Sequence, residues 1–162
     1  MKTVYVMVGI PGSGKSTVIQ SMQKDLKGSS ITISRDAIRF SLLKEGERYF
    51  AKERQVFPKF IEECFNAIQD EFDHVFIDAT HISPISRERL LRPLFDLIKL
   101  KEYKIVFQII NTPVEVCIER DKERAGRQHV GEQVIRDMFK NFNPPDEEEL
   151  DYYNAIAVEV IG

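Results

Sequence analysis

The hydrophobic and polar positions of the chain change period several times, and each change marks the boundary of an expected element. Short apolar runs rich in β-branched residues predict strands that are buried on both faces of a sheet. The segments between them carry apolar residues at helical spacing. Because strands and helices alternate throughout, the sequence predicts an α/β fold with a doubly wound parallel sheet. The expected strands cover residues 3–8, 31–34, 74–81, 103–110 and 155–161.

Residues 49–72 form a long, mixed segment that carries an apolar stripe at helical spacing and contains a proline. Pro58 either begins a second helix or kinks a single one. We expect the aromatic rings of this stretch to lie in the core and not on a surface that stacks bases. Its apolar stripe comprises Phe57, Phe60, Ile61, Cys64, Phe65 and Ile68.

The remaining helical patterns are shorter, and two of them open with a capping residue followed by proline. Ser83 and Pro84 open one of these helices, and Thr112 and Pro113 open the other. Pro93 is expected to disturb the first of them locally. Residues 143–149 are polar and predict a connector that is too short to separate domains. The other helices are expected over residues 17–26, 35–43 and 130–142.

Composition and charge limit the classes of protein to which the chain can belong. With 162 residues, 43% of them hydrophobic, the chain is expected to form one domain over residues 1–162. No apolar run is long enough to span a membrane, and no secretory signal precedes the first strand. Cys64 and Cys117 lie in different expected helices, so we interpret them as buried thiols in a reducing cytoplasm. A net charge of −3 argues against coating nucleic acid through bulk electrostatics, but it allows a local basic cleft.

The strongest chemical signal is the glycine-rich turn after the first strand. It fits the pattern G-x-x-x-x-G-K-[ST], in which backbone amides and a helix N-terminus surround a phosphate. Lys15 is expected to reach the β- and γ-phosphates of a nucleotide, and the Ser16 hydroxyl to ligate Mg²⁺. A side chain on Gly12 or Gly14 would obstruct the phosphates. The residues expected to bind the nucleotide are Gly9, Pro11, Gly12, Ser13, Gly14, Lys15, Ser16 and Thr17.

Asp36 follows the second expected strand. Either Asp36 or Ser34 could cap the helix that begins here, and capping is the simplest explanation for the carboxylate. The alternative is that Asp36 lies at the carboxyl edge of the sheet, where open α/β sheets bind ligands, with Arg39 one turn further on the same face. A carboxylate beside a guanidinium suits a substrate that carries both a hydroxyl and a phosphate.

Asp78 closes the third apolar run. P-loop enzymes use an acidic residue at this place to orient Mg²⁺, directly or through water, so Asp78 is a Walker-B candidate. The alternative is an aspartate that ends the strand by bonding to the turn. His81 lies beside the same turn, and we interpret it as a structural hydrogen-bonding residue without a chemical role.

A charged cluster lies at the end of the helix after the fourth strand. Arg120 and Arg124 are four residues apart, so we expect them to share a helix face, where like charges repel. Asp121 and Glu123 could offset the repulsion on a solvated helix. The alternative is that a bound triphosphate offsets it and that Gly126 is the hinge of a mobile flap.

Four motifs, taken in order, resemble those of the 5′-hydroxyl polynucleotide kinases of the phage type. The likeness extends over nearly the whole chain, and only the phosphate loop is specific by itself. The family commonly has Asn where this chain has His81 and Pro where it has Gly131, and some members have an acid where it has Ala79. The motifs are the phosphate loop at residues 9–17, residues 34–39, residues 78–84, and Arg120 with Arg124 followed by residues 130–135.

The resemblance implies a three-layer P-loop NTPase fold with a helical lid and a five-stranded parallel sheet in the order 2-3-1-4-5. It implies ATP as donor, Mg²⁺ as cofactor and a 5′-hydroxyl end of DNA or RNA as acceptor and partner. Asp36 would then be the general base and Arg39 the ligand of the acceptor phosphate. Asp78 and Thr80 would contact the substrate, and Asp78 would also serve the metal. Lys15, Arg120 and Arg124 would act on the donor phosphates.

Two other hypotheses stay open. The same machinery with a different acceptor pocket would phosphorylate a nucleoside, a nucleotide, a small metabolite or a hydroxylated DNA base. A nucleotide-binding switch or adaptor without catalysis belongs to a different class. The sequence has no N-K-x-D motif and no D-x-x-G motif after the phosphate loop, which argues against a switch.

Overall fold

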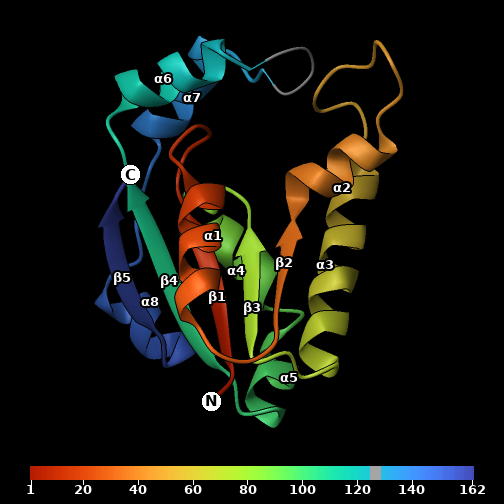
Figure 1. Cartoon of the computed structure of the whole chain (residues 1–162), viewed down its shortest axis with the longest axis vertical. Helices are drawn as coiled ribbons and strands as arrows, with labels where there is room; N and C mark the ends of the chain where they lie inside the picture. Colours follow the sequence, from red (N-terminus) through yellow and green to blue (C-terminus); the bar gives the residue numbers. More distant parts are fainter. Residues whose placement is uncertain (125–128) are drawn as a thin grey trace.

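A five-stranded parallel sheet forms the centre of the computed structural model, which describes residues 1–124 and 129–162 (Figure 1). The strand order is β2-β3-β1-β4-β5, and every neighbouring pair is parallel. Both the alternation of strands and helices and the order implied by the resemblance are therefore confirmed. The strands are β1 (Thr3–Val8), β2 (Ser30–Ser34), β3 (His74–Asp78), β4 (Lys104–Asn111) and β5 (Ile156–Ile161).

Helices cover the two faces of the sheet unequally. On one face, residues of α3, α4, α5 and α8 join the main core cluster around β1, whereas α1 packs against the other face through Ile19. All six residues of β1 are buried, as a β-branched run at the centre of a parallel sheet requires. The helices are α1 (Lys15–Asp25), α2 (Arg35–Leu42), α3 (Glu53–Gln69), α4 (Pro84–Leu91), α5 (Phe95–Leu100), α6 (Val114–Lys122), α7 (Glu132–Lys140) and α8 (Glu147–Tyr153).

The proline of the long helical stretch lies inside a single helix. Pro58 is exposed in α3, so the helix continues through it and no second helix begins there. The expected apolar stripe is only partly correct, because Phe65 is 41% exposed while Phe60 and Cys64 are buried. The buried face of α3 is instead formed by Val56, Phe60, Cys64, Ala67 and Ile68.

The C-terminal part of the expected polar connector is helical, so the prediction for residues 143–149 is wrong in its second half. Asp146 caps α8 by accepting a hydrogen bond from the Glu149 amide at 2.9 Å. Three glutamates follow the cap, and negative charge in the first turn stabilises a helix through its dipole. The acidic run has no apolar stripe, so the hydrophobic pattern gives no signal for this helix.

Thr112 does not cap α6, which corrects a second expectation. Pro113 is the N-cap residue and makes no side-chain capping bond. The Thr112 hydroxyl instead donates to the carbonyl of Ser13 at 2.7 Å, and this bond joins the start of α6 to the glycine-rich turn. Cys64 and Cys117 are buried free thiols, as expected. None of the described helices is both long and apolar enough to cross a membrane.

Figure 1 places α6 and α7 above one side of the carboxyl ends of the strands, with α2 and the loop that follows it above the other side. The turn between β1 and α1 lies between these two parts. The residues expected to carry chemistry come from the same end of the sheet, which is where parallel α/β folds bind ligands.

Candidate active site

The turn between β1 and α1 has the backbone of a phosphate loop. Gly12 and Gly14 have φ angles of 81° and 100°, a region that L side chains rarely adopt. A Cβ on Gly12 would lie 2.6 Å from the carbonyl oxygen of Cys117 in α6. Glycine is thus needed at position 12 because α6 packs closely against the loop, and the obstruction of bound phosphates by a side chain here stays a prediction.

Lys15 lies at the mouth of this loop. Its ammonium donates to the carbonyl oxygens of Gly9 and Ile10, both at 3.0 Å, and an ammonium has a third proton to donate. Burial lowers the pKa of Lys15, while the carboxylates of Asp78 and Asp36 act in the opposite direction. Both carboxylates are therefore close enough to act on the lysine charge.

Ser16 and Asp78 form a pair of oxygen donors beside Lys15. The Ser16 hydroxyl donates to Asp78 Oδ2 at 3.4 Å, although the residues come from α1 and β3. Burial raises the pKa of Asp78, and the charge of Lys15 opposes this effect. A hydroxyl and a carboxylate are hard oxygen ligands that fit Mg²⁺, which usually takes its other ligands from phosphate and water. Within residues 1–124 and 129–162, no group of three or more His, Cys, Asp or Glu side chains is arranged so that it could hold a metal ion.

Asp36 does not cap α2. The cap is Ser34, which accepts a hydrogen bond from the Ala37 amide at 3.1 Å. The Asp36 side chain is 49% exposed and forms an ion pair with Arg39, one turn further along the helix. The capping explanation for the carboxylate is therefore wrong, because Ser34 is the cap and Asp36 instead lines the cleft, paired with Arg39.

Arg39 is almost completely buried and held from three sides. Its Nε donates to Glu53 Oε1 at 2.6 Å, and its Nη1 donates to the Tyr49 hydroxyl at 2.8 Å and to Asp36. Glu53 also accepts a hydrogen bond from Arg35 at 3.0 Å. The guanidinium thus links the start of α3 to Asp36, a tighter arrangement than the expected open pair.

Sequence reasoning missed Tyr49, Phe50 and Glu53, which all line the site. The Tyr49 hydroxyl donates to Asp36 Oδ1. Burial, followed by the nearby Asp36 charge, raises the pKa of Tyr49. Phe50 is 50% exposed, which contradicts the expectation of core packing for the aromatic residues of this stretch. The one available signal was that residues 49–50 precede the region of helical periodicity.

The two arginines of the expected lid occupy different structural positions. Arg120 belongs to α6 and donates from Nη1 to the Gly12 carbonyl at 3.1 Å, whereas Arg124 follows the end of the helix. The prediction that they share a helix face is therefore wrong, but both line the cleft. Arg124 contributes a positive charge that lowers the pKa of Lys15. The proposed hinge at Gly126 lies outside the described residues.

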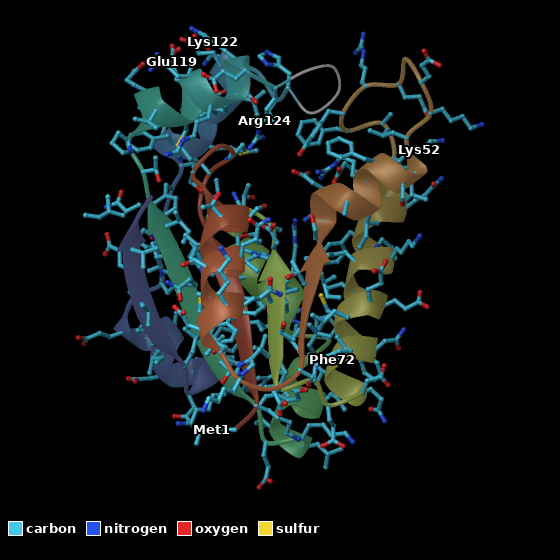
Figure 2. The ribbon with its side chains drawn as sticks, viewed as in Figure 1. Met1, Lys52, Phe72, Glu119, Lys122 and Arg124 are labelled. Carbon is cyan, nitrogen blue, oxygen red and sulfur yellow. The ribbon has the colours of Figure 1, made fainter. Side chains whose placement is uncertain are left out.

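Asp121 does not neutralise either arginine. It is buried and accepts hydrogen bonds from the amides of Val130 and Gly131 at 2.8 and 2.9 Å. Among the residues that the structure describes, no carboxylate lies within ion-pairing distance of Arg120 or Arg124. Figure 2 shows Arg124 on the side of α6 that faces α2, with Lys52 beyond α2 on the opposite side. Because neither Arg120 nor Arg124 is paired with a carboxylate of the described residues, their two positive charges are available for an anionic ligand.

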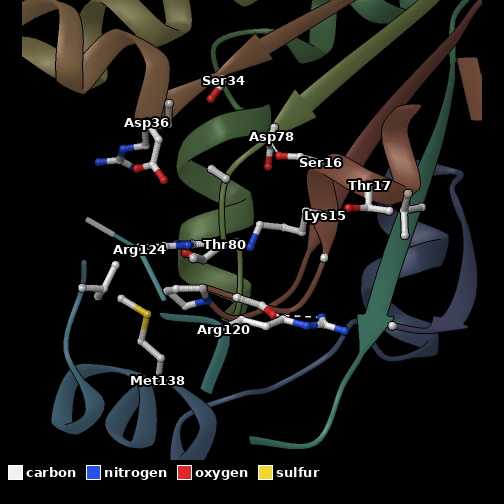
Figure 3. A pocket seen from close by; sticks show the side chains of 18 of the residues that line it. Lys15, Ser16, Thr17, Ser34, Asp36, Asp78, Thr80, Arg120, Arg124 and Met138 are labelled. Atoms are coloured by element: carbon white, nitrogen blue, oxygen red, sulfur yellow. Dashed lines mark hydrogen bonds between the residues drawn. The ribbon is translucent and has the colours of Figure 1, made fainter. Parts of the chain in front are cut away.

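A single cleft of about 830 Å³ contains most of the expected site. Figure 3 shows Asp36, Lys15 and Arg124 arranged around it, with Asp78 and Thr80 close by. Two expected loop residues do not line it. Gly9 lies beneath Ser13, and Ser13 is fully buried, with a hydroxyl that has no hydrogen-bond partner in the described structure. The expected residues along the cleft are Pro11, Gly12, Gly14, Lys15, Ser16, Thr17, Asp36, Arg39, Asp78, Thr80, Arg120 and Arg124.

His81 supports the site from behind, as expected for a structural histidine. It is buried, and its Nδ1 lies 2.9 Å from the Met7 carbonyl oxygen. Burial lowers its pKa to about 4. Arg87, which is fully buried, donates to the His81 carbonyl at 2.8 Å and forms an ion pair with Glu149 of α8. These contacts fix the turn after β3 that carries Thr80.

The fold and the phosphate loop define a P-loop kinase-like domain, a class that binds nucleotide, typically with Mg²⁺. Residues 4–145 match the family described as AAA domain, and the chain belongs to this family. No curated protein matches the sequence.

Several solved structures share the fold at low sequence identity. A chain of the Pnkp1/Rnl/Hen1 RNA repair complex is 20% identical with a TM-score of 0.71, and the match covers 94% of this chain but 45% of that one. A putative kinase from Chloroflexus aurantiacus is 15% identical, with a TM-score of 0.69 and coverage of 99% and 88%. A sugar kinase from Janibacter is 13% identical, with a TM-score of 0.64 and coverage of 99% and 86%. The chain therefore spans less than half of the RNA repair protein that it matches.

Proposed function

We propose that the protein is an ATP-dependent kinase that phosphorylates the 5′-hydroxyl end of DNA or RNA in a reducing cytoplasm. The observation that carries the proposal is the position of Asp36. Its carboxylate lies in the same cleft as Lys15, and the two charges are close enough to interact. This arrangement supports a role for Asp36 as the base for a hydroxyl, beside a loop that would bind the triphosphate.

In the proposed reaction, the acceptor oxygen forms a bond to the γ-phosphorus of ATP while the bond from that phosphorus to the β,γ-bridging oxygen breaks. ADP leaves, and the hydroxyl proton passes to Asp36. The chain contributes mainly positioning and charge stabilisation, because no covalent bond to the protein forms during this phosphoryl transfer.

On the donor side, three cationic side chains supply positive charge. Lys15 moves from the Gly9 and Ile10 carbonyls toward the phosphates, where its charge stabilises the transferring group. Arg120 and Arg124 supply further positive charge along the loop. Mg²⁺, held by Ser16 and Asp78, would neutralise charge on the phosphate oxygens when bound.

A small-molecule kinase is the second candidate. The solved structures that this chain matches over most of both lengths include a sugar kinase and a gluconokinase. In addition, Arg39 is engaged by Glu53, Tyr49 and Asp36, so it offers an acceptor phosphate fewer free N–H groups than an open arginine would.

The direct test supplies ATP labelled at the γ-phosphate together with a panel of acceptors. The panel contains 5′-hydroxyl DNA and RNA oligonucleotides, nucleosides, a duplex with hydroxylated bases, gluconate and simple sugars. We expect label on the 5′-hydroxyl oligonucleotides with at least tenfold higher kcat/KM than on any sugar. Label on a sugar or gluconate alone would overturn the proposal in favour of the second candidate.

A further inference from the structure

An aromatic pair lies next to the carboxylate that would activate the acceptor. Tyr49 and Phe50 belong to the turn between α2 and α3, and both line the cleft. Their rings meet edge to face with centroids 4.6 Å apart.

Contacts with Asp36 and Arg39 fix the position of Tyr49. Its hydroxyl donates to Asp36 Oδ1 and accepts from Arg39 Nη1, and its ring lies 4.2 Å from the Arg39 guanidinium carbon. A partly buried hydroxyl with two charged partners loses much of its freedom to rotate. The ring of Tyr49 therefore forms a rigid support for its neighbour.

Phe50 is the exposed member of the pair. Half of its surface is accessible, although a large apolar ring gains stability from burial. It borders the cleft beside Arg39, whose guanidinium carbon lies 5.6 Å from the centroid of the Phe50 ring. An accessible aromatic ring backed by a fixed tyrosine is the kind of surface on which a flat apolar group stacks.

The positive charge of Arg39 is already compensated by two carboxylates. Glu53 lies 2.6 Å from its Nε and Nη2, and Asp36 pairs with its Nη1. A guanidinium in this state is a weak ligand for a further anion, because the anion would have to compete with two carboxylates. Recognition of the acceptor at this end of the cleft thus depends more on the aromatic surface than on charge.

We propose that Phe50 stacks on the base attached to the acceptor hydroxyl's own ribose, so that the protein prefers acceptors whose terminal nucleotide carries a base. This inference rests on the proposed function and names the group that the acceptor side recognises. Tyr49 acts as a positioning residue that holds both the Phe50 ring and the Asp36 carboxylate. Sugars and polyols, which have no aromatic face, are poor acceptors for such a surface.

The test compares two 5′-hydroxyl oligonucleotides that differ only in the terminal residue, which either carries its base or is an abasic tetrahydrofuran. Stacking of one base on an aromatic ring changes affinity by about tenfold or more. We expect wild-type kcat/KM to be about tenfold lower for the abasic acceptor, mainly through KM. Phe50→Leu should lower kcat/KM for the normal acceptor by about tenfold and abolish the discrimination, whereas Phe50→Trp should keep it.

The matched control is Phe65→Leu, because Phe65 is similarly exposed but lies on α3 outside the cleft. It should leave the discrimination unchanged, and all variants should keep the wild-type circular dichroism spectrum and KM for ATP. Equal kcat/KM of wild type for both oligonucleotides would overturn the inference while leaving the proposed function intact. Transfer of label to neither oligonucleotide would overturn both.

Discussion

Arg39 and Asp36 lie one helical turn apart on α2 and form an ion pair at the edge of the cleft. The same guanidinium donates to Glu53 at 2.6 Å, so it joins the carboxylate of α2 to the first turn of α3. The direction in which Asp36 faces is therefore set by a network and not by its own backbone position alone.

Replacing Arg39 by lysine tests this network. Lysine keeps the positive charge but lacks the planar fork that serves two carboxylates and a hydroxyl together. We expect Arg39→Lys to lower the free energy of unfolding by about 1–3 kcal/mol, since hydrogen bonds to charged groups are lost. The rate of transfer should fall about tenfold because Asp36 is less well oriented. Urea unfolding and steady-state kinetics measure the two effects.

Arg54→Lys is the control for this prediction, because Arg54 is an exposed residue of the same helix α3. It should change the free energy of unfolding by less than about 0.5 kcal/mol, as is usual for surface substitutions. If Arg39→Lys behaves like Arg54→Lys, then the network does not orient the carboxylate.

Lys15→Met separates nucleotide binding from stability. Burial lowers the pKa of Lys15, which means that the folded protein disfavours its charge, so removing the charge offsets the loss of the hydrogen bonds to the Gly9 and Ile10 carbonyls. We expect an unchanged or higher melting temperature without nucleotide. Wild type at a concentration of Mg-ATP 100 times its Kd should gain about 2.7 kcal/mol, and the variant should gain far less. Thermal melts with and without Mg-ATP give the answer, and an equal gain in both proteins would exclude Lys15 from the donor site.

Gly12→Ala and Gly46→Ala form a matched pair for the close approach of α6. Both glycines have a φ near 80°, but a Cβ on Gly12 would lie 2.6 Å from the Cys117 carbonyl, whereas a Cβ on Gly46 meets nothing within 4 Å. Both variants should lose about 1–2 kcal/mol from the backbone conformation. Gly12→Ala should lose at least about 1 kcal/mol more, because its side chain overpacks the contact. Equal losses in chemical denaturation would contradict the packing argument.

His81→Asn addresses the pH dependence of stability. The pKa of His81 is about 4 in the folded protein against 6.5 ordinarily, so between these values the unfolded chain binds a proton that the folded chain does not. Wild type should thus lose about 2 kcal/mol relative to His81→Asn as the pH falls from 7.5 to 4.5. Asn suits the position because its φ is 45° and its amide can donate to the Met7 carbonyl. Urea titrations of both proteins at the two pH values measure this difference. An equal loss of the free energy of unfolding in wild type and His81→Asn would contradict the prediction.

The strands and the phosphate loop could be predicted because their signals are local. A buried parallel strand reads as a continuous apolar run, and a phosphate loop needs glycine and lysine at fixed spacing. The place of the carboxylates at positions 36 and 78 could also be predicted. Each follows or ends an expected strand, and the carboxyl ends of parallel strands meet at one edge of the sheet.

The acceptor side could not be predicted, because its parts meet only through tertiary structure. Glu53 reaches Arg39 across the loop between two helices, and nothing in their spacing indicates the contact. Phe50 resembles a core residue by type, and only the folded chain shows that its ring is accessible. Likewise, Thr112 has the sequence of a helix cap, but its hydroxyl bonds to Ser13 in the glycine-rich turn.

The most direct test of the central claim, that Asp36 is the base for a hydroxyl acceptor, is single-turnover transfer of label from γ-labelled ATP in Asp36→Asn. Asparagine keeps the shape of the side chain but cannot take up the proton. We predict that transfer to a 5′-hydroxyl oligonucleotide falls by at least about a hundredfold, the usual contribution of a general base, while the calorimetric Kd for Mg-ATP stays within about twofold. Transfer at the wild-type rate in this variant would contradict the account.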